Sequence, residues 1–191
     1  MENKAVPTSA EIENELKRER HKLRYKKTVK STVFALITAV AAAVLVATLW
    51  LPVLQIYGSS MEPTLAEGNI VISVKDNKHE IGDVVAFYYG NKVLIKRYIA
   101  GPGQWVEIAD DGTISVDGVP LEEKYIDKKA IGICDLEFPF QVPDNSHFLV
   151  GDHRETSVDS RHSSVGCISD EQMIGKIIAR VWPLDSIGPI R

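Results

Sequence analysis

The chain has 191 residues, enough for one domain and a membrane anchor. Its formal net charge is −4, but residues 1–30 carry nine Lys or Arg against five Glu, whereas residues 55–191 carry 13 basic and 21 acidic side chains. Such an acidic body argues against a nucleic-acid partner, which requires a clustered basic face.

The N-terminal segment is predicted to be helical. Thr8-Ser9-Ala10-Glu11 resembles a capping box, and the sequence from Ala10 to Lys30 is charged and free of proline. We expect residues 1–30 to form a basic, helical tail that faces solvent or lipid headgroups. This helix should continue into the apolar segment that follows.

Residues 31–54, STVFALITAVAAAVLVATLWLPVL, contain no charged side chain. About 20 apolar residues span a bilayer as a helix, so the segment predicts a transmembrane helix with Trp50 at its interfacial end. The basic flank precedes it, and the positive-inside rule therefore puts the N-terminus in the cytoplasm and residues 55–191 on the extracytoplasmic side of the cell membrane. The rival interpretation is a cleaved signal peptide, but the apolar region of such a peptide is roughly 7–15 residues and a small-x-small site follows it.

After Leu65 the pattern changes to short β-branched and aromatic runs separated by Gly, Pro, Asn and Asp. Asn91 and Asp110-Asp111-Gly112 mark hairpin turns. The fold class is therefore mainly β, with a closed or folded-over antiparallel sheet that leaves few open edges. Residues 122–146 are expected to be loop. The predicted strands are 69–74, 83–89, 92–100, 104–108, 113–118, 147–151 and 176–182.

YGSSMEPTL, residues 57–65, directly follows the apolar segment and offers two serines. The nucleophile-elbow motif Gly-x-Ser-x-Gly fails here because Glu62 stands at its last position, and Ser-x-x-Lys occurs nowhere in the chain. A serine nucleophile would thus need its base from elsewhere.

The histidines offer one possible base. His153 follows Asp152 and could complete a serine–histidine–aspartate set, although no local signature supports it. His147, Asp152, His153 and His162 could also be read as metal ligands, but their spacing matches no zinc pattern. We expect no metal and no cofactor. Cys134 and Cys167 could pair outside the cell, and the sequence leaves this open.

Lys96 is the other possible base. It lies in KVLIKRYIA, where Leu94, Lys96 and Tyr98 share one face of a strand. Desolvation disfavours the ammonium form and lowers the lysine pKa. If that pKa fell by roughly 3 from its usual value of about 10.4, the amine could act as a base near neutral pH. The alternative is a snorkelling lysine at a strand edge that keeps its proton.

Three blocks in this order resemble bacterial type I signal peptidases, the leader peptidase family, in its compact Gram-positive-like form. The blocks are YGSSMEPTL, then GDVVAFYY with VLIKRYIAGPG, then VGDHRETSVDSR, at residues 57–65, 82–103 and 150–161. A membrane anchor precedes the first block, as in that family. The resemblance covers roughly residues 30–185.

The resemblance implies a serine/lysine dyad, with Ser60 as nucleophile and Lys96 as general base. Ser157 matches the serine that orients the lysine, while Asp159 and Arg161 match a supporting charged pair, and Arg97 is a further supporting residue. Neutral Lys96 would take the Ser60 proton, an acyl-enzyme would form, and the lysine would then activate water. The Ser60 N–H would be an oxyanion donor.

The resemblance also implies the substrate, secretory preproteins cut after small-x-small motifs such as Ala-x-Ala. The substrate pockets are expected from residues near the dyad, although core packing is an alternative role for each. The protein is expected to be a monomer, anchored where the apolar segment of its substrate lies. The expected pocket residues are Ile56, Met61, Leu65 and Ile95.

The sequence departs from the family pattern at four places. Gly58 stands where some members carry a hydroxyl that contributes to the oxyanion hole, His153 replaces an asparagine, and Gln104 replaces an aspartate. Four residues, His-Ser-Ser-Val, separate Arg161 from Gly166, where two are expected. These differences affect the surroundings of the dyad and leave the dyad itself intact.

Two other function classes remain open. A silent relative could act as an anchored accessory protein, which the loss of Ser60 or Lys96 would favour, but both are present. A related serine/lysine protease could instead cut itself or one dedicated partner, giving a stoichiometric nick in place of turnover.

Overall fold

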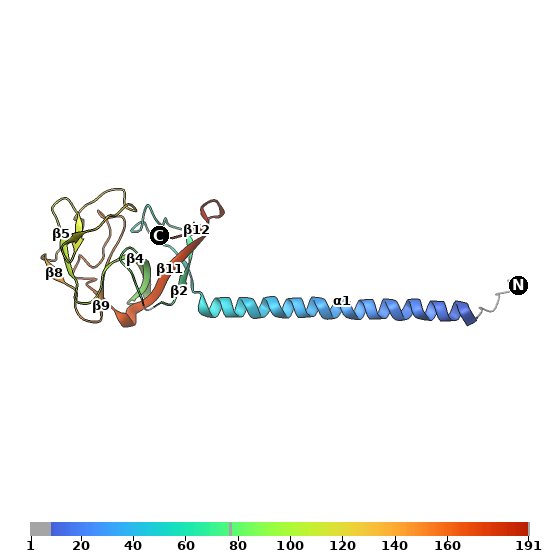
Figure 1. The fold of residues 1–191 in the computed structure, drawn as a ribbon. Helices are drawn as coiled ribbons and strands as arrows, with labels where there is room; N and C mark the ends of the chain where they lie inside the picture. The colour runs from blue at the N-terminus through green and yellow to red at the C-terminus, as the bar shows by residue number, and fades with distance from the viewer. Residues whose placement is uncertain (1–8, 77, 191) are drawn as a thin grey trace. The chain divides into compact units, whose positions relative to one another are not determined.

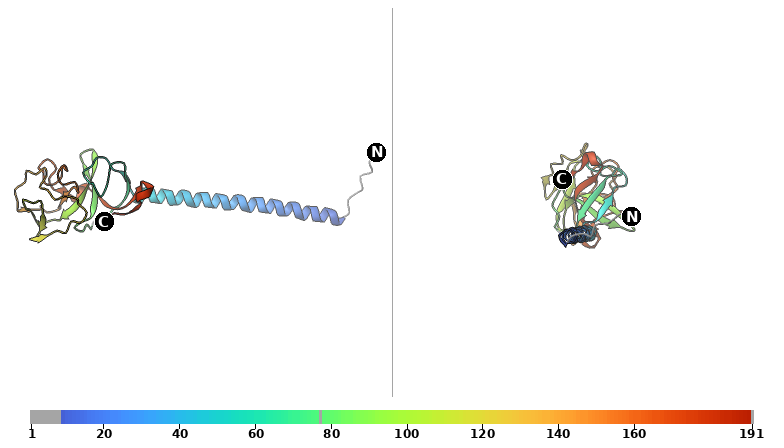
Figure 2. Two further views of the ribbon diagram at one scale, coloured as in Figure 1. Left: turned by 90° about the horizontal axis from the view of Figure 1, so that it is seen from above. Right: turned by 90° about the vertical axis from the view of Figure 1, so that its right-hand side faces the viewer.

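The computed structural model describes residues 9–76 and 78–190 (Figure 1). The chain divides into two compact units, Met1–Leu49 and Trp50–Arg191. The described part of the first unit is helical, and the second unit is a β-rich body. Figure 2 shows the strands of this body from two further directions.

The helix α1, Ser9–Trp50, is continuous, as the sequence predicts. Within it, Ile12–Leu45 is long and apolar enough to cross a membrane. The hydroxyl of Thr38 donates to the carbonyl of Phe34 at 2.9 Å, which satisfies the hydroxyl inside the apolar stretch. Thr8, the first residue of the predicted capping box, lies outside the described residues.

The helix ends four residues before the predicted position 54. Pro52 has no N–H to continue a helix, and it disfavours helical backbone in the residue before it. Val53–Gln55 then forms strand β1, which pairs with β2. Strand pairing to the body therefore sets this boundary, although residues 53 and 54 belong to the same apolar run.

The body consists of two antiparallel sheets, which confirms the mainly β fold class. The larger has the order β1-β2-β11-β3-β4-β9-β10, with β12 paired to β11, and the smaller has the order β7-β6-β5-β8. The bounds are β1 Val53–Gln55, β2 Ile70–Val74, β3 Val84–Tyr89, β4 Lys92–Ala100, β5 Trp105–Ile108, β6 Ile114–Val116, β7 Val119–Pro120, β8 Phe140–Gln141, β9 Ser146–Val150, β10 Ile168–Ser169, β11 Met173–Trp182 and β12 Gly188–Pro189. Two short 3₁₀ helices, η1 Asp170–Gln172 and η2 Leu184–Ser186, flank β11.

All seven predicted strands are present; β4 has the predicted bounds, and the ends of the others differ by at most three residues. Asn91 lies in the turn between β3 and β4, and the Asp110-Asp111-Gly112 turn joins β5 to β6, as predicted. Residues 122–146 are mainly loop, with β8 as the exception. No sequence pattern indicated the short strands β1, β7, β8, β10 and β12.

The core lies in three clusters that join these strands. In one of them Ile99 and Phe148 of the larger sheet pack with Val106 and Ile114 of the smaller sheet. A second cluster lies beside β2, β3 and β11 and includes Met61, a residue of the YGSSMEPTL segment. Apolar burial therefore fixes this segment against the larger sheet.

Strand β4 is paired differently along its two halves. It pairs with β3 from Lys92 to Arg97, whereas its pairing with β9 begins only at Arg97. Within the described residues, the outer edge of Lys92–Lys96 has no strand partner. Within the described residues, β1 also pairs on one side only. The sheet order runs β1-β2-β11-β3-β4, and each neighbouring pair is antiparallel, so after four such steps β1 and β4 run in the same direction.

Gly175 and Gly188 provide a matched test of packing in β11 and its neighbour β12. Gly175 has φ of 154°, and a Cβ there would lie 2.2 Å from the carbonyl oxygen of Val74. Gly175→Ala should lower the free energy of unfolding by about 1–3 kcal/mol, as measured by urea denaturation of the full chain in detergent. At Gly188 an added Cβ meets nothing within 4 Å, so Gly188→Ala should leave the free energy of unfolding unchanged. Equal effects would contradict the packing described for Gly175.

Candidate active site

The segment after β1 forms a tight turn that presents Ser60. Gly58 has φ of 81°, a left-handed conformation that favours glycine. The N–H of Glu62 donates to the carbonyl of Ser59 at 3.0 Å, and that of Leu65 donates to the carbonyl of Met61 at 2.8 Å. Because the side chains of Met61 and Leu65 are buried in the core, the turn is held rigidly from one side.

Lys96 lies against Ser60. Its Nζ donates to the Ser60 Oγ at 2.6 Å, and its side chain is almost fully buried, with the residue 4% exposed. Burial lowers the Lys96 pKa to about 8, against the raising effect of the Asp159 charge and with a further lowering effect from Arg161. An amine with this pKa is neutral in a useful fraction of molecules near pH 7–8 and can accept a proton.

Segment 150–161 closes the site around Gly151. The N–H of His153 donates to the carbonyl of Ser60 at 3.1 Å. A Cβ at Gly151 would lie 2.6 Å from that carbonyl oxygen and 2.1 Å from the Ser157 Oγ, so only glycine lets both serines pack here. Ser157 is buried, and its hydroxyl makes no hydrogen bond to Lys96. It acts instead on the Asp159 carboxylate, whose pKa it helps to lower.

Asp159 and Arg161 form a fully buried ion pair. The Nε and Nη2 of Arg161 donate to the two carboxylate oxygens at 2.8 Å each. Burial favours the neutral acid, but the Arg161 hydrogen bonds and charge outweigh it, so the Asp159 pKa is lowered. Asp159 also accepts the N–H of Gly151 at 2.9 Å, while Arg161 donates to the carbonyl of Ile131 at 2.7 Å. The pair thus connects Gly151 to the 122–146 loop.

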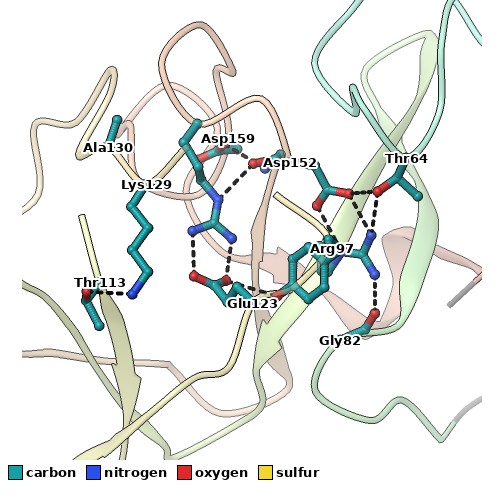
Figure 3. Close-up of polar contacts among 12 residues, drawn as sticks. Thr64, Gly82, Arg97, Thr113, Glu123, Lys129, Ala130, Asp152 and Asp159 are labelled. Carbon is teal, nitrogen blue, oxygen red and sulfur yellow. Dashed lines mark hydrogen bonds and ion pairs between the residues drawn. The ribbon is translucent and has the colours of Figure 1, made fainter. Parts of the chain in front are cut away.

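Arg97, the residue after Lys96 on β4, connects three other segments through Thr64, Gly82 and Asp152 (Figure 3). Its Nε and Nη2 donate to the Asp152 carboxylate at 2.9 and 2.6 Å, and its Nη1 donates to the carbonyl of Gly82 at 2.6 Å. Thr64 donates to the same carboxylate at 2.5 Å. The guanidinium carbon lies 3.7 Å from the centre of the Tyr125 ring. Such a fully buried pair is stabilised because its donors and acceptors are satisfied.

Sequence patterns did not predict a third buried ion pair. Arg154 forms a bidentate ion pair with Glu123, and its Nε donates to the carbonyl of Gly151 at 3.1 Å. Tyr125 donates to Glu123 at 2.9 Å, and burial followed by the Glu123 charge raises the Tyr125 pKa. Arg154 lies in a charged block that could have drawn attention, whereas Glu123 lies in the stretch with the weakest pattern.

The dyad opens into a cleft of about 810 Å³ between β1 and the free half of β4. Of the four predicted pocket residues, Ile56, Met61 and Ile95 line this cleft. Leu65 is absent from its lining and is fully buried in the core, the alternative role that the sequence left open.

The candidate histidines have other partners. His153 Nδ1 contacts the Thr156 hydroxyl at 2.7 Å, and His147 lies between Tyr98 and Asp170. His162 contacts Ser164 at 2.8 Å. No three His, Cys, Asp or Glu residues gather as metal ligands in the part of the chain that the structure describes. Neither the histidine base nor the four-residue metal set is therefore assembled.

The cysteines and Gln104 complete the candidate positions. Cys134 and Cys167 are free thiols, and burial raises the pKa of Cys167 to about 11. Gln104 accepts the N–H of Gly101 at 2.8 Å and donates to Asp117 at 2.9 Å. Gln104 thus has a structural role at the start of β5, through hydrogen bonds to two turns.

Comparison with known proteins gives consistent matches. Residues 28–182 match the family described as signal peptidase, peptidase S26. Signal peptidase I of Leptolyngbya laminosa is 31% identical over 150 residues, covering 71% of this chain and 70% of that protein. Signal peptidase IB of Staphylococcus aureus is 35% identical over 149 residues, covering 67% of this chain and 76% of that protein. The crystal structure of a signal peptidase I from Enterococcus faecalis V583 has a TM-score of 0.42 and 27% identity, covering 52% of this chain and 96% of that one.

These matches identify the chain as a serine peptidase, a hydrolase of peptide bonds. Within this class, it belongs to the peptidase S26 family, the signal peptidases.

The buried Arg97–Asp152 pair can be tested against an exposed one. Arg97→Met leaves the Asp152 carboxylate buried without its cation, so the free energy of unfolding should fall by about 3–5 kcal/mol. Lys124 and Glu122 are 3.1 Å apart with side chains 87% and 84% exposed, and Lys124→Met should cost less than about 1 kcal/mol. Urea denaturation followed by tryptophan fluorescence measures both. A small loss for Arg97→Met would contradict its bridging role.

Proposed function

We propose that this protein is a membrane-anchored serine endopeptidase that removes signal peptides from secretory preproteins after small-x-small motifs, with Ser60 as nucleophile and Lys96 as general base. The observation that carries the proposal is the 2.6 Å contact from the Lys96 Nζ to the Ser60 Oγ. It is supported by the burial that lowers the Lys96 pKa to about 8.

The chemistry follows from this contact. The neutral Lys96 amine takes the Ser60 proton while the Ser60 oxygen attacks the carbonyl carbon of the substrate, and the protonated amine then gives its proton to the leaving nitrogen. The resulting ester is hydrolysed when the same amine removes a proton from water. The Ser60 N–H has no acceptor among the described residues, so it can donate to the negative oxygen that forms. With Gly58 in place of a hydroxyl residue, we assign no side-chain donor to that oxygen.

The substrate is proposed to bind as an extended strand between β1 and the free half of β4. An exposed strand edge supplies hydrogen bonds to a peptide main chain, and pockets on alternate positions give specificity. The residues Ile56, Met61 and Ile95 line the cleft. Their apolar side chains can contact small apolar side chains on one face of the bound strand, in keeping with cleavage after a small-x-small motif.

The helix α1 supports the membrane part of the proposal. It would span the bilayer once, with its basic N-terminal residues in the cytoplasm and the β-rich body on the extracytoplasmic side. Such an anchor holds the dyad near the apolar segment of a preprotein and thus raises the effective concentration of the substrate. The proposed enzyme acts as a monomer, because Ser60 and Lys96 come from the same chain.

Substitution of the dyad tests the proposal. Ser60→Ala and Lys96→Met should each lower kcat/KM by roughly a thousandfold or more, because nucleophile and base act as one unit. The substrate is a preprotein ending its signal in Ala-x-Ala, and turnover in detergent is followed by gel. Ser59→Ala is the matched control on the same turn and should retain cleavage. Retained cleavage in folded Lys96→Met would overturn the lysine-base mechanism, while a single stoichiometric nick by the wild type would favour a dedicated-partner protease.

The pH dependence gives a second test. Lys96 must be neutral to act, and its pKa is lowered to about 8, so kcat/KM should rise with pH, reach half its maximum at about pH 8 and then level off. One pH unit lower, about a tenth of the molecules carry the neutral amine. Initial rates between about pH 5 and 11 measure this profile. A midpoint of about 6.5 would indicate a histidine, and one of about 10.4 an ordinary exposed lysine.

A further inference from the structure

A second cavity, of about 750 Å³, adjoins the main cleft at the dyad, and Ser60 and Lys96 line both cavities. On β4, Lys92 and Leu94 also line both cavities, whereas Val93 and Ile95 line the main cleft alone. Since alternate residues of a strand point to opposite faces, the second cavity lies on the even-numbered face of β4.

The far wall of the second cavity is the four-residue stretch after Arg161 in which the chain departs from the family pattern. Ser164 and Val165 of this stretch line the cavity. The Tyr89 hydroxyl donates to the carbonyl of Ser164 at 2.6 Å, which connects the stretch to the end of β3. On its other side, Ser163 donates through its N–H and hydroxyl to Asp135 at 2.6 and 2.5 Å. The longer stretch is therefore a fixed wall.

In a peptide bound along the free edge of β4, successive side chains would point to opposite faces of the sheet, as they do in β4 itself. Its two small side chains would face Ile95 in the main cleft. The side chain between them must then point to the opposite face, where Lys92 and Leu94 line the second cavity. This placement rests on the function proposed above.

The chemistry of the second cavity selects a kind of side chain. None of its lining residues is acidic, and Lys92 makes no ion pair with any residue that the structure describes. Leu94, Val158 and Val165 offer apolar contact to a stem, and Asn91 and Ser164 offer hydrogen bonds to a polar end. An exposed ammonium of this kind attracts a carboxylate and repels a second ammonium.

We propose that the second cavity is a specificity pocket for the middle residue of the small-x-small motif. It favours a long side chain with a carboxylate or amide end and disfavours lysine. The preference arises from the wall at residues 162–165 and from Lys92.

The test uses peptides with Ala-x-Ala before the scissile bond, where x is Ala, Gln, Glu or Lys, and the full chain in detergent. The wild type should cleave the Glu peptide with kcat/KM about three- to fivefold above the Ala peptide, the scale of one exposed ion pair, with Gln between them and Lys below Ala. Lys92→Gln should remove the difference between Glu and Lys while Gln stays above Ala.

Val158 allows the cavity to be filled directly. It is 43% exposed, so Val158→Trp should fold, and it should bring the Glu-to-Ala ratio of kcat/KM down to about one. Val119, 64% exposed on β7 and absent from the cavity lining, is the matched control, and Val119→Trp should keep the wild-type ratio.

The outcomes separate the two proposals. Equal kcat/KM for all four peptides in an enzyme that cleaves them through Ser60 would overturn the specificity pocket alone. A preference that survives in Val158→Trp would do the same. Absence of Ser60-dependent cleavage of every peptide would overturn the proposed function and the pocket together.

Discussion

The rest of the active site depends on one constraint, a lysine side chain kept out of water beside a serine hydroxyl. Lowering the Lys96 pKa from 10.5 to about 8 corresponds to about 3 kcal/mol of preference for the neutral amine. The fold must supply this preference by burial, because the nearby Asp159 favours the charged form. Strand β4 meets the requirement by placing Lys96 at the end of its free half, where the pairing with β9 begins one residue later. Access to substrate and burial of the amine are thus provided by the same strand.

The carboxylates behind Lys96 belong to a set of three buried ion pairs. Asp152, Asp159 and Glu123 each bind an arginine through two hydrogen bonds. Buried charges are tolerated only when their partners are complete, and the three arginines also donate to backbone carbonyls of Gly82, Ile131 and Gly151. The pairs therefore serve as rigid connections between segments distant in the sequence, and they leave Ser60 as the only hydrogen-bond partner of the Lys96 amine within the described residues.

Sequence patterns predicted the features that rest on local order. The continuous helix and the seven longer strands follow from periodicity and turn residues. The placement of Ser60 beside Lys96 came from the resemblance of three motif blocks to a known family. The end of α1 did not follow, because the apolar run continues through Val53 and only pairing with β2 makes that residue part of a strand. Glu123 was unpredictable for a similar reason. Its partner Arg154 lies 31 positions away, and nothing in a stretch without periodicity indicates a buried carboxylate. Ser157 shows the opposite case, since its position in the site matches the motif whereas its expected hydrogen bond is not formed.

The free edge of β4 has a consequence for how the protein behaves at high density in a membrane. An unpaired strand edge accepts any extended chain of suitable shape, including the same edge of a second molecule, and such sheet extension is a common route to aggregation. Anchored proteins share a plane, which brings equivalent surfaces to the same height and makes side-by-side encounters frequent. Lys92 lies at the start of this edge and is exposed. A lysine on an exposed strand edge disfavours pairing with a second copy of that edge, whereas a substrate strand with no basic side chain opposite Lys92 meets no such penalty.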